Sequence, residues 1–276
     1  MAPSIAQAAL AVLFASSLVH GAPNMTPSYE IHLLMNPSVV LGSDNKLTPT
    51  VLSTFAMPTS VTKMNVQFLD TDAKDIYTAG WSPRIRKMEG ASDFDLTYKW
   101  RTEVSGGDIN AALNTANADG FDASDTNYEA QIEWSYTKQT LSISRSKSDS
   151  KSGYSGMDLP SKKDSRKLLI DNAPGKFDDW LGSGWGTDTL AVSRIYGPVL
   201  AKRSIGTWNG TQLYIEVWPI NNATSGGITW IVEASFKTND LTTASNGKAN
   251  LQSFLTTKGW FLAQDSLKTS LIMANY

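Results

Sequence analysis

The sequence predicts an α+β fold dominated by one large β-sheet, either open or closed into a barrel, with a small number of helices. The main observation is that apolar and polar residues alternate with a period of two, as they do in half-buried strands. A second observation is that helix-start signals are few in this chain. Eight segments show the alternation: residues 29–35, 61–69, 82–87, 94–101, 128–135, 193–207, 212–218 and 229–237.

Helices are predicted where a capping residue precedes an apolar stretch. Thr48 followed by Pro49 starts a helix over residues 51–55, because proline is favoured at the first helical position. Asp108 is suited to cap a helix over 109–115. A helical turn is expected at 177–181. The C-terminal part is expected to hold two more helices, one over 249–257 that stops at Gly259 and one from Asp265 or Ser266 to residue 272.

Residues 144–167 differ from the rest in composition. The segment is rich in serine, carries seven basic residues against three aspartates, and has little apolar content. Such composition is typical of a solvated, flexible insertion. An anion-binding role is the alternative for its basic cluster, which consists of Lys162, Lys163, Arg166 and Lys167.

The N-terminal segment has the features of a secretory signal peptide. Residues 8–19 are mostly apolar, too few to span a bilayer, and Ala22-Pro23 follows as a cleavage position. We therefore expect residues 1–22 to be removed and residues 23–276 to form one secreted, extracellular domain. Secretion would expose three Asn-x-Thr glycosylation sites, at Asn24, Asn209 and Asn222.

Composition excludes several classes of site and partner. The chain has no cysteine, which rules out disulfides, thiolate metal ligands and cysteine nucleophiles. Its net charge of −2 gives no basis for nucleic acid or a membrane surface as partner. His32 is the one histidine outside the signal segment, and no nucleophile-elbow, phosphate-loop or dinucleotide glycine pattern is present.

Charged residues concentrate on one face of the predicted strands. Because side chains at i and i+2 point the same way, Glu30 and His32 share a face opposite Ile31 and Leu33. An open antiparallel sheet with water on one side would produce this alternation. A barrel with its charged face turned inward would also produce it, and the charged positions, which include arginine pairs, point that way: Arg84, Arg86, Lys99, Arg101, Glu129, Glu133, Glu216, Glu233 and Lys237.

A tunnel lined in this manner would suit phosphate chemistry. Arginine and lysine donate to phosphoryl oxygens, and arginine forms two parallel hydrogen bonds to one phosphate. Carboxylates opposite them would hold a divalent cation that offsets phosphate charge and activates water.

Residues 67–101, QFLDTDAKDIYTAGWSPRIRKMEGASDFDLTYKWR, resemble the CYTH, or triphosphate tunnel metalloenzyme, family. In that family a strand pair with the pattern YDT…L…AG..LR.R is followed by LT.K. The resemblance continues more loosely and covers residues 28–237. The positions that carry it are Asp70-Thr71, Ala79-Gly80, Arg84, Arg86, Lys99, Arg203, Glu216 and Glu233.

The resemblance implies an eight-stranded antiparallel barrel that forms a tunnel, with flanking helices. It also implies hydrolysis of triphosphate or polyphosphate, or adenylyl cyclisation, with Mg²⁺ or Mn²⁺ as cofactor. Carried over by position, Arg84, Arg86, Lys99 and Arg203 would bind phosphate. Glu216 and Glu233 would be catalytic, Glu133 is a further candidate of that kind, and the metal ligands would be Glu30, His32, Glu216 and Glu233.

The first strand departs from the family. Its signature there is Glu-x-Glu-x-Lys, whereas this chain reads Glu30-Ile31-His32-Leu33-Leu34. Imidazole is a poor ligand for magnesium, which prefers oxygen. Three functions therefore stay open: a secreted metal-dependent phosphohydrolase acting on a phosphorylated small molecule or polyphosphate, a catalytically silent extracellular protein that binds an anion or glycan, and an interaction protein that reuses the scaffold.

Overall fold

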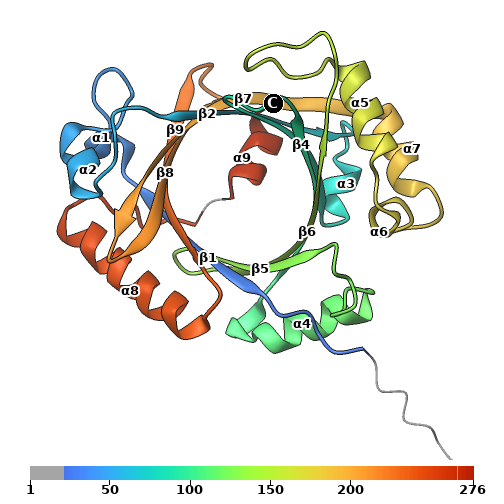
Figure 1. Cartoon of the computed structure of the whole chain (residues 1–276), viewed down its shortest axis with the longest axis horizontal. Coiled ribbons are helices and arrows are strands. Elements are labelled where there is room, and N and C mark those ends of the chain that lie inside the picture. Colours follow the sequence, from blue (N-terminus) through green and yellow to red (C-terminus); the bar gives the residue numbers. More distant parts are fainter. Residues whose placement is uncertain (1–21, 266) are drawn as a thin grey trace, which may run out of the picture.

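The computed structural model describes residues 22–265 and 267–276, and its main feature is a closed barrel of strands (Figure 1). Around the barrel the strands follow the order β1-β5-β6-β4-β3-β2-β7-β8-β9. In chain order they are β1 (Ser28–Met35), β2 (Thr62–Asp70), β3 (Trp81–Met88), β4 (Phe94–Glu103), β5 (Glu129–Trp134), β6 (Gln139–Asp149), β7 (Arg194–Trp208), β8 (Thr211–Asn221) and β9 (Ile228–Thr238).

All eight strands expected from the alternation are present, but the prediction of an eight-stranded antiparallel barrel is wrong. The barrel has a ninth strand, β6, and its sheet is mixed. β1 runs parallel to β5, with Ser28 opposite Gln131 and Ile31 opposite Trp134, and every other neighbouring pair is antiparallel. A parallel pair needs a long crossover, which the three intervening strands β2 to β4 supply.

The flexible insertion expected at residues 144–167 is also wrong for half of its length, namely residues 144–149 and 162–167. Its first part belongs to β6, whose Leu141 and Ile143 are fully buried in the core. Its last part forms α5 (Lys162–Asp171), which Ser161 caps by accepting a hydrogen bond from the Asp164 amide. Serines that face the barrel interior gave β6 the composition of a loop.

The basic cluster of that segment lies on the outside of the barrel, on α5. Arg166 donates to the Ser193 carbonyl, and the Lys167 ammonium lies 2.7 Å from the Asp171 carboxylate. Lys162 and Lys163 are exposed. These contacts give the cluster a structural and solvated role on the α5 surface.

The apolar faces of the strands point outward and are covered by helices (Figure 1). α8 (Leu241–Thr257) packs on β1 and β9. On the opposite side, Trp81, Trp100, Phe121, Phe177 and Trp180 form one aromatic cluster beneath α4 to α7. The remaining helices are α1 (Pro37–Val40), α2 (Pro49–Thr54), α3 (Asp75–Thr78), α4 (Ile109–Ala118), α6 (Gly175–Asp178) and α7 (Trp185–Val192).

Helix α8 begins eight residues before the predicted start. Its cap is Asp240, whose carboxylate accepts a hydrogen bond of 2.7 Å from the Thr243 amide. Most residues of its first two turns are polar or small. The helical spacing of apolar residues is therefore visible only in the second half of α8. Among the described residues, none of the helices has the length and apolar character needed to cross a membrane.

The C-terminal helix α9 (Lys268–Asn275) lies inside the ring of strands, unlike the other helices (Figure 1). Its Ile272 and Met273 pack against Met64, Val66 and Trp218 on the inner face of the barrel. This helix therefore closes part of the lumen with apolar side chains.

Asp70, the first residue of the Asp-Thr pair in the family-like segment, has a structural role. Its buried carboxylate accepts hydrogen bonds from the amides of Thr71, Ile76 and Tyr77, at 2.7 to 3.0 Å. These bonds fix the turn that leads from β2 into α3. Burial raises the pKa of this carboxyl group even though the three amides favour its charge.

Candidate anion site in the barrel lumen

The inward face of the barrel encloses a cavity of about 440 Å³. Seven basic side chains line it against five acidic ones, an excess of two positive charges before His32 is counted. The basic residues are Arg84, Arg86, Lys99, Arg101, Arg203, Lys237 and Lys268, and the acidic ones are Glu30, Glu129, Glu133, Glu216 and Glu233.

One group of charges in the cavity centres on Glu133 of β5. Its carboxylate accepts from the Lys99 ammonium at 2.8 Å and from the Arg101 guanidinium at 3.0 Å. Burial alone would raise the pKa of Glu133, but the two cations hold this pKa well below its usual range. The group is therefore a buried ion network with one excess positive charge, in which each member depends on the others for burial.

A second group centres on Glu216 of β8 and Glu233 of β9, which lie opposite each other in the ladder. The Lys268 ammonium reaches both carboxylates, at 2.8 Å from Glu216 and 2.6 Å from Glu233. Arg203 donates twice to Glu216, at 2.9 and 2.6 Å. His32 Nδ1 lies 3.5 Å from the second oxygen of Glu233.

The protonation states of this second group follow from its contacts. Burial opposes charge on Glu216, but Lys268 and Arg203 outweigh it and lower the pKa of the carboxyl group. Burial also opposes charge on Lys268, and the two glutamates raise the pKa of its ammonium despite it. For His32 the attraction of Glu233 likewise exceeds the burial effect and raises the imidazole pKa. All of these groups are thus stabilised in their charged forms.

Arg84 and Arg86 of β3 form the third group, and Arg84 differs from every other cation just described. It pairs with no carboxylate in the described part of the chain, and its one hydrogen bond is from Nη2 to Thr97 Oγ1 at 2.9 Å. Its Nε is buried without a partner, as is the Nε of Arg86, which pairs with Asp95. Burial and the neighbouring Arg86 charge lower the pKa of Arg84 to about 10.

Comparison with solved structures places this barrel among known folds. A protein from Hippeastrum assigned as an adenylyl cyclase, with a dominant triphosphatase activity, aligns over 89% of this chain and 94% of its own, with a TM-score of 0.53 and 12% identity. The barrel shares the fold of this Hippeastrum protein. A Bacillus halodurans protein assigned as an adenylate cyclase covers 91% of this chain and 97% of its own, at a TM-score of 0.49 and 12% identity. No protein-family model and no curated protein sequence matches the chain.

The structure confirms the predicted closed barrel, and the charged strand faces line its lumen. It brings together every residue for which the sequence predicted phosphate or metal binding. Those residues are Glu30, His32, Arg84, Arg86, Lys99, Arg203, Glu216 and Glu233, and all of them line the one cavity. Their catalytic and binding roles stay predictions.

The sequence pattern placed Arg101 on the charged strand face without giving it a role, and it missed Lys268 altogether. Arg101 lies two residues after Lys99 and therefore on the same strand face. Both side chains donate to the Glu133 carboxylate. Lys268 had no signal at all, because it enters the lumen from a helix after the last strand. Leu34, where the family pattern has lysine, lies opposite Glu233 in the ladder, and the ammonium that contacts Glu233 comes from Lys268 instead.

The carboxylates of the tunnel do not fit a divalent metal in this arrangement. Glu216, Glu233 and Glu133 are each bound by cations of the protein, and Glu30 lies 3.6 Å from the Lys237 ammonium. Within residues 22–265 and 267–276, no three carboxylate or imidazole groups are arranged around a common point. Since a metal site needs a full set of free ligands, the metal assignment inferred from the resemblance remains without geometric support.

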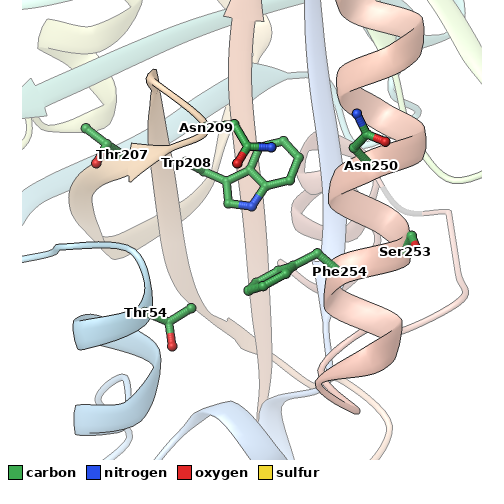
Figure 2. Close-up of a pocket in the computed structure, with 7 residues that line it drawn as sticks. All are labelled: Thr54, Thr207, Trp208, Asn209, Asn250, Ser253 and Phe254. Atoms are coloured by element: carbon green, nitrogen blue, oxygen red, sulfur yellow. The ribbon is translucent and has the colours of Figure 1, made fainter.

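The second pocket, of about 510 Å³, lies outside the tunnel between β7, α2 and α8 (Figure 2). Figure 2 shows Trp208 and Phe254 beside each other, with their ring centroids 6.4 Å apart. The seven described residues that line this pocket are all uncharged. A pocket of this composition offers no countercharge to a phosphate, so the tunnel is the better candidate site.

The three predicted glycosylation sites differ in accessibility. The Asn24 side chain donates to Asn114 Oδ1 and accepts from Asn117 Nδ2, and the Asn222 side chain accepts from the backbone amides of Thr224 and Ser225. Asn209 is exposed in the turn between β7 and β8, on the rim of the pocket in Figure 2. Attachment of a glycan to any of them stays a prediction, and Asn209 is the most accessible acceptor.

Asp265 fixes the segment before α9 and gives the structure a measurable pH dependence. It accepts from Ser135 Oγ at 2.5 Å and from the Thr137 amide at 2.9 Å, and these bonds outweigh burial and lower its pKa to about 2. A lowered folded-state pKa stabilises the fold above pH 4, and this contribution is lost as the pH falls towards 2.

We therefore expect Asp265→Asn to lower the free energy of unfolding at pH 7 by about 1 kcal/mol, after allowance for solvent screening. The variant should also lose part of the acid dependence between pH 4 and pH 2. Urea unfolding at several pH values measures both effects, with Asp44→Asn, an exposed carboxylate paired only with Lys46, as control. Equal pH profiles for wild type and Asp265→Asn would contradict the assignment.

Proposed function

We propose that the tunnel binds a linear phosphate chain, of the tripolyphosphate or nucleoside triphosphate class. The observation that carries this proposal is the Arg84 guanidinium, which lies in the lumen without a carboxylate partner among the described residues and has a buried, unused Nε donor. A buried charge of this kind is costly unless an anion compensates it. A phosphate accepts two parallel hydrogen bonds from an arginine and would supply that compensation.

The surroundings of Arg84 favour phosphate over a single carboxylate. Thr97, Ser144 and Ser146 line the cavity beside Arg84 and Arg86 and present hydroxyl donors. Further along the lumen, Lys99 and Arg101 add cations, although Glu133 balances part of their charge. Basic groups thus follow one another along the tunnel, as an extended chain of phosphates requires.

The fold gives independent support for the ligand class. The Hippeastrum protein with the same fold has a dominant triphosphatase activity. Hydrolysis by the present chain would require a divalent cation, and the carboxylates of Glu216 and Glu233 are already bound by protein cations. The geometry therefore favours binding without turnover over metal-dependent hydrolysis.

Isothermal titration of tripolyphosphate into the protein tests the proposal. We expect one saturable site whose affinity falls with rising salt, because the contacts are between full charges. Tripolyphosphate should bind more tightly than monophosphate. Absence of saturable binding by the folded protein at low salt would refute a phosphate-binding tunnel.

A phosphate-release assay separates binding from turnover. Tripolyphosphate and ATP are incubated with Mg²⁺, Mn²⁺ or a chelator, and free phosphate is measured. We expect no metal-dependent release at protein concentrations that give full binding. Phosphate release that requires Mn²⁺ or Mg²⁺ would show that the protein is a metal-dependent phosphohydrolase and would contradict binding without turnover.

We further propose that this binding takes place outside the cell. The support is the signal-like N-terminal segment and the three Asn-x-Thr sites in a chain without cysteine. The predicted signal peptide, apart from Ala22, lies outside the described residues. Mass spectrometry of the protein recovered from culture medium would test secretion through an N-terminus at Pro23 and a glycan mass at Asn209.

A further inference from the structure

We propose that Lys268 is a built-in cation which occupies the space between Glu216 and Glu233, so that the tunnel binds its ligand without a divalent metal. Ligand binding itself rests on the function proposed above, whereas the exclusion of metal rests on the geometry of this cluster alone. The inference names α9, and not the barrel strands, as the element that decides the metal requirement.

The Lys268 ammonium lies between the two carboxylates. Its contacts of 2.8 and 2.6 Å mean that Glu216 Oε2 and Glu233 Oε1 lie within 5.4 Å of each other, on either side of one cation. Two carboxylate oxygens around one positive centre are the core of many divalent metal sites. Lys268 supplies that centre as part of the polypeptide.

The remaining lone pairs of the two glutamates are also in use. Trp218 Nε1 donates to the same Glu216 oxygen at 2.9 Å, and Arg203 binds the other oxygen. His32 lies beside the second oxygen of Glu233. A metal entering this cluster would meet a charge already balanced by Lys268 and Arg203, and it would have to displace hydrogen bonds as well as the ammonium.

The anchoring of α9 also matters, because a loosely held lysine would yield its place to a metal. The Tyr77 hydroxyl shares a hydrogen bond with Ser270 Oγ at 2.7 Å, and the Tyr276 hydroxyl accepts from the Asn221 amide at 3.1 Å. Asn275 Oδ1 accepts from the Ala223 amide at 3.1 Å. Together with the apolar contacts of Ile272, these bonds hold both ends of the helix in the barrel.

An aromatic ring also lies beside the Lys268 ammonium. Its ammonium lies 5.2 Å from the centroid of the Trp218 ring, which forms part of the lumen wall. The side chain is thus positioned by an aromatic surface and two carboxylates. A lysine located in this manner is a specificity-determining residue for the cation of the site.

Manganese binding, followed by electron paramagnetic resonance and by thermal shift, tests the inference without any phosphate ligand. Wild-type protein at pH 7.5 should bind no Mn²⁺ in the lumen and show no metal-dependent rise in melting temperature. Lys268→Ala should gain one Mn²⁺ site, with a Kd on the order of 10⁻⁴ M as for weak carboxylate sites. Adding Glu233→Gln to Lys268→Ala should abolish the gained site.

The controls separate this inference from the proposed function. Lys237→Ala also removes a lysine of the lumen, but one whose ion-pair partner in the described part of the chain is the single carboxylate of Glu30, and it should gain no Mn²⁺ site. Saturable Mn²⁺ binding by wild-type protein that is lost in Glu233→Gln would overturn the inference, and so would a folded Lys268→Ala that binds no Mn²⁺. The Mn²⁺ measurement on wild-type protein tests the inference even if a variant fails to fold. None of these Mn²⁺ measurements depends on whether tripolyphosphate binds.

Discussion

Replacing Glu216 by alanine is expected to lower the free energy of unfolding by about 3–5 kcal/mol, the usual cost of removing one partner from a buried ion pair. Glu216 accepts hydrogen bonds from Arg203, Lys268 and Trp218, and its carboxylate is 7% exposed. Its removal leaves the Arg203 guanidinium without its carboxylate, and it leaves the Lys268 ammonium with Glu233 as its remaining ion-pair partner among the described residues.

Urea unfolding monitored by tryptophan fluorescence measures this effect at pH 7. The matched control is Glu30→Ala, which removes a glutamate of the same cavity whose contact with Lys237 is longer and whose side chain is 24% exposed. Its cost should stay below about 1 kcal/mol. Equal stabilities of the two variants would show that the Glu216 network does not contribute to the fold.

The second large effect concerns the ligand. Arg84→Ala is expected to weaken tripolyphosphate binding about 10- to 100-fold, because a hydrogen bond to a charged group contributes about 1.5–3 kcal/mol. The fold should tolerate this change, since within residues 22–265 and 267–276 Arg84 makes one side-chain hydrogen bond, to Thr97, and pairs with no carboxylate. The melting temperature is therefore expected to stay the same or rise, while affinity falls.

Titration calorimetry on wild type, Arg84→Ala and Arg194→Ala makes this comparison. Arg194 lies at the start of β7, outside the cavity, and pairs with the exposed Asp72. Its loss removes the same charge from the whole protein and should change the affinity less than 2-fold. An equal loss of affinity in the two variants would mean that tripolyphosphate binding depends on the net charge of the protein and not on the tunnel.

Most of the strands could be predicted from the sequence because apolar residues alternate along them with polar or charged ones. That pattern survives in any barrel whose outer surface is covered by helices. It failed for β6, whose inward positions Ser142, Ser144 and Ser146 are small and polar in a serine-rich stretch. The alternation of Leu141 and Ile143 was present but too short to outweigh composition.

The charged residues of the site could be predicted only where they lie on strands. Arg84, Arg86 and Glu216 were found because period two fixes the face on which they lie. Lys268 follows no such rule, since its position depends on how α9 packs into a barrel formed by residues far away in the sequence. For the same reason the pairing of Glu216 and Glu233 with protein cations, and not with a metal, was visible only in three dimensions.

The central claim is that the tunnel, in the state described, is a metal-free site for a phosphate chain. A crystal structure of the protein grown with tripolyphosphate and a chelator tests it most directly. The account predicts phosphate density within hydrogen-bond distance of Arg84 and Arg86, with the Lys268 ammonium still between Glu216 and Glu233. Tripolyphosphate bound only outside the barrel, or bound in the lumen only after a metal has displaced Lys268, would contradict it.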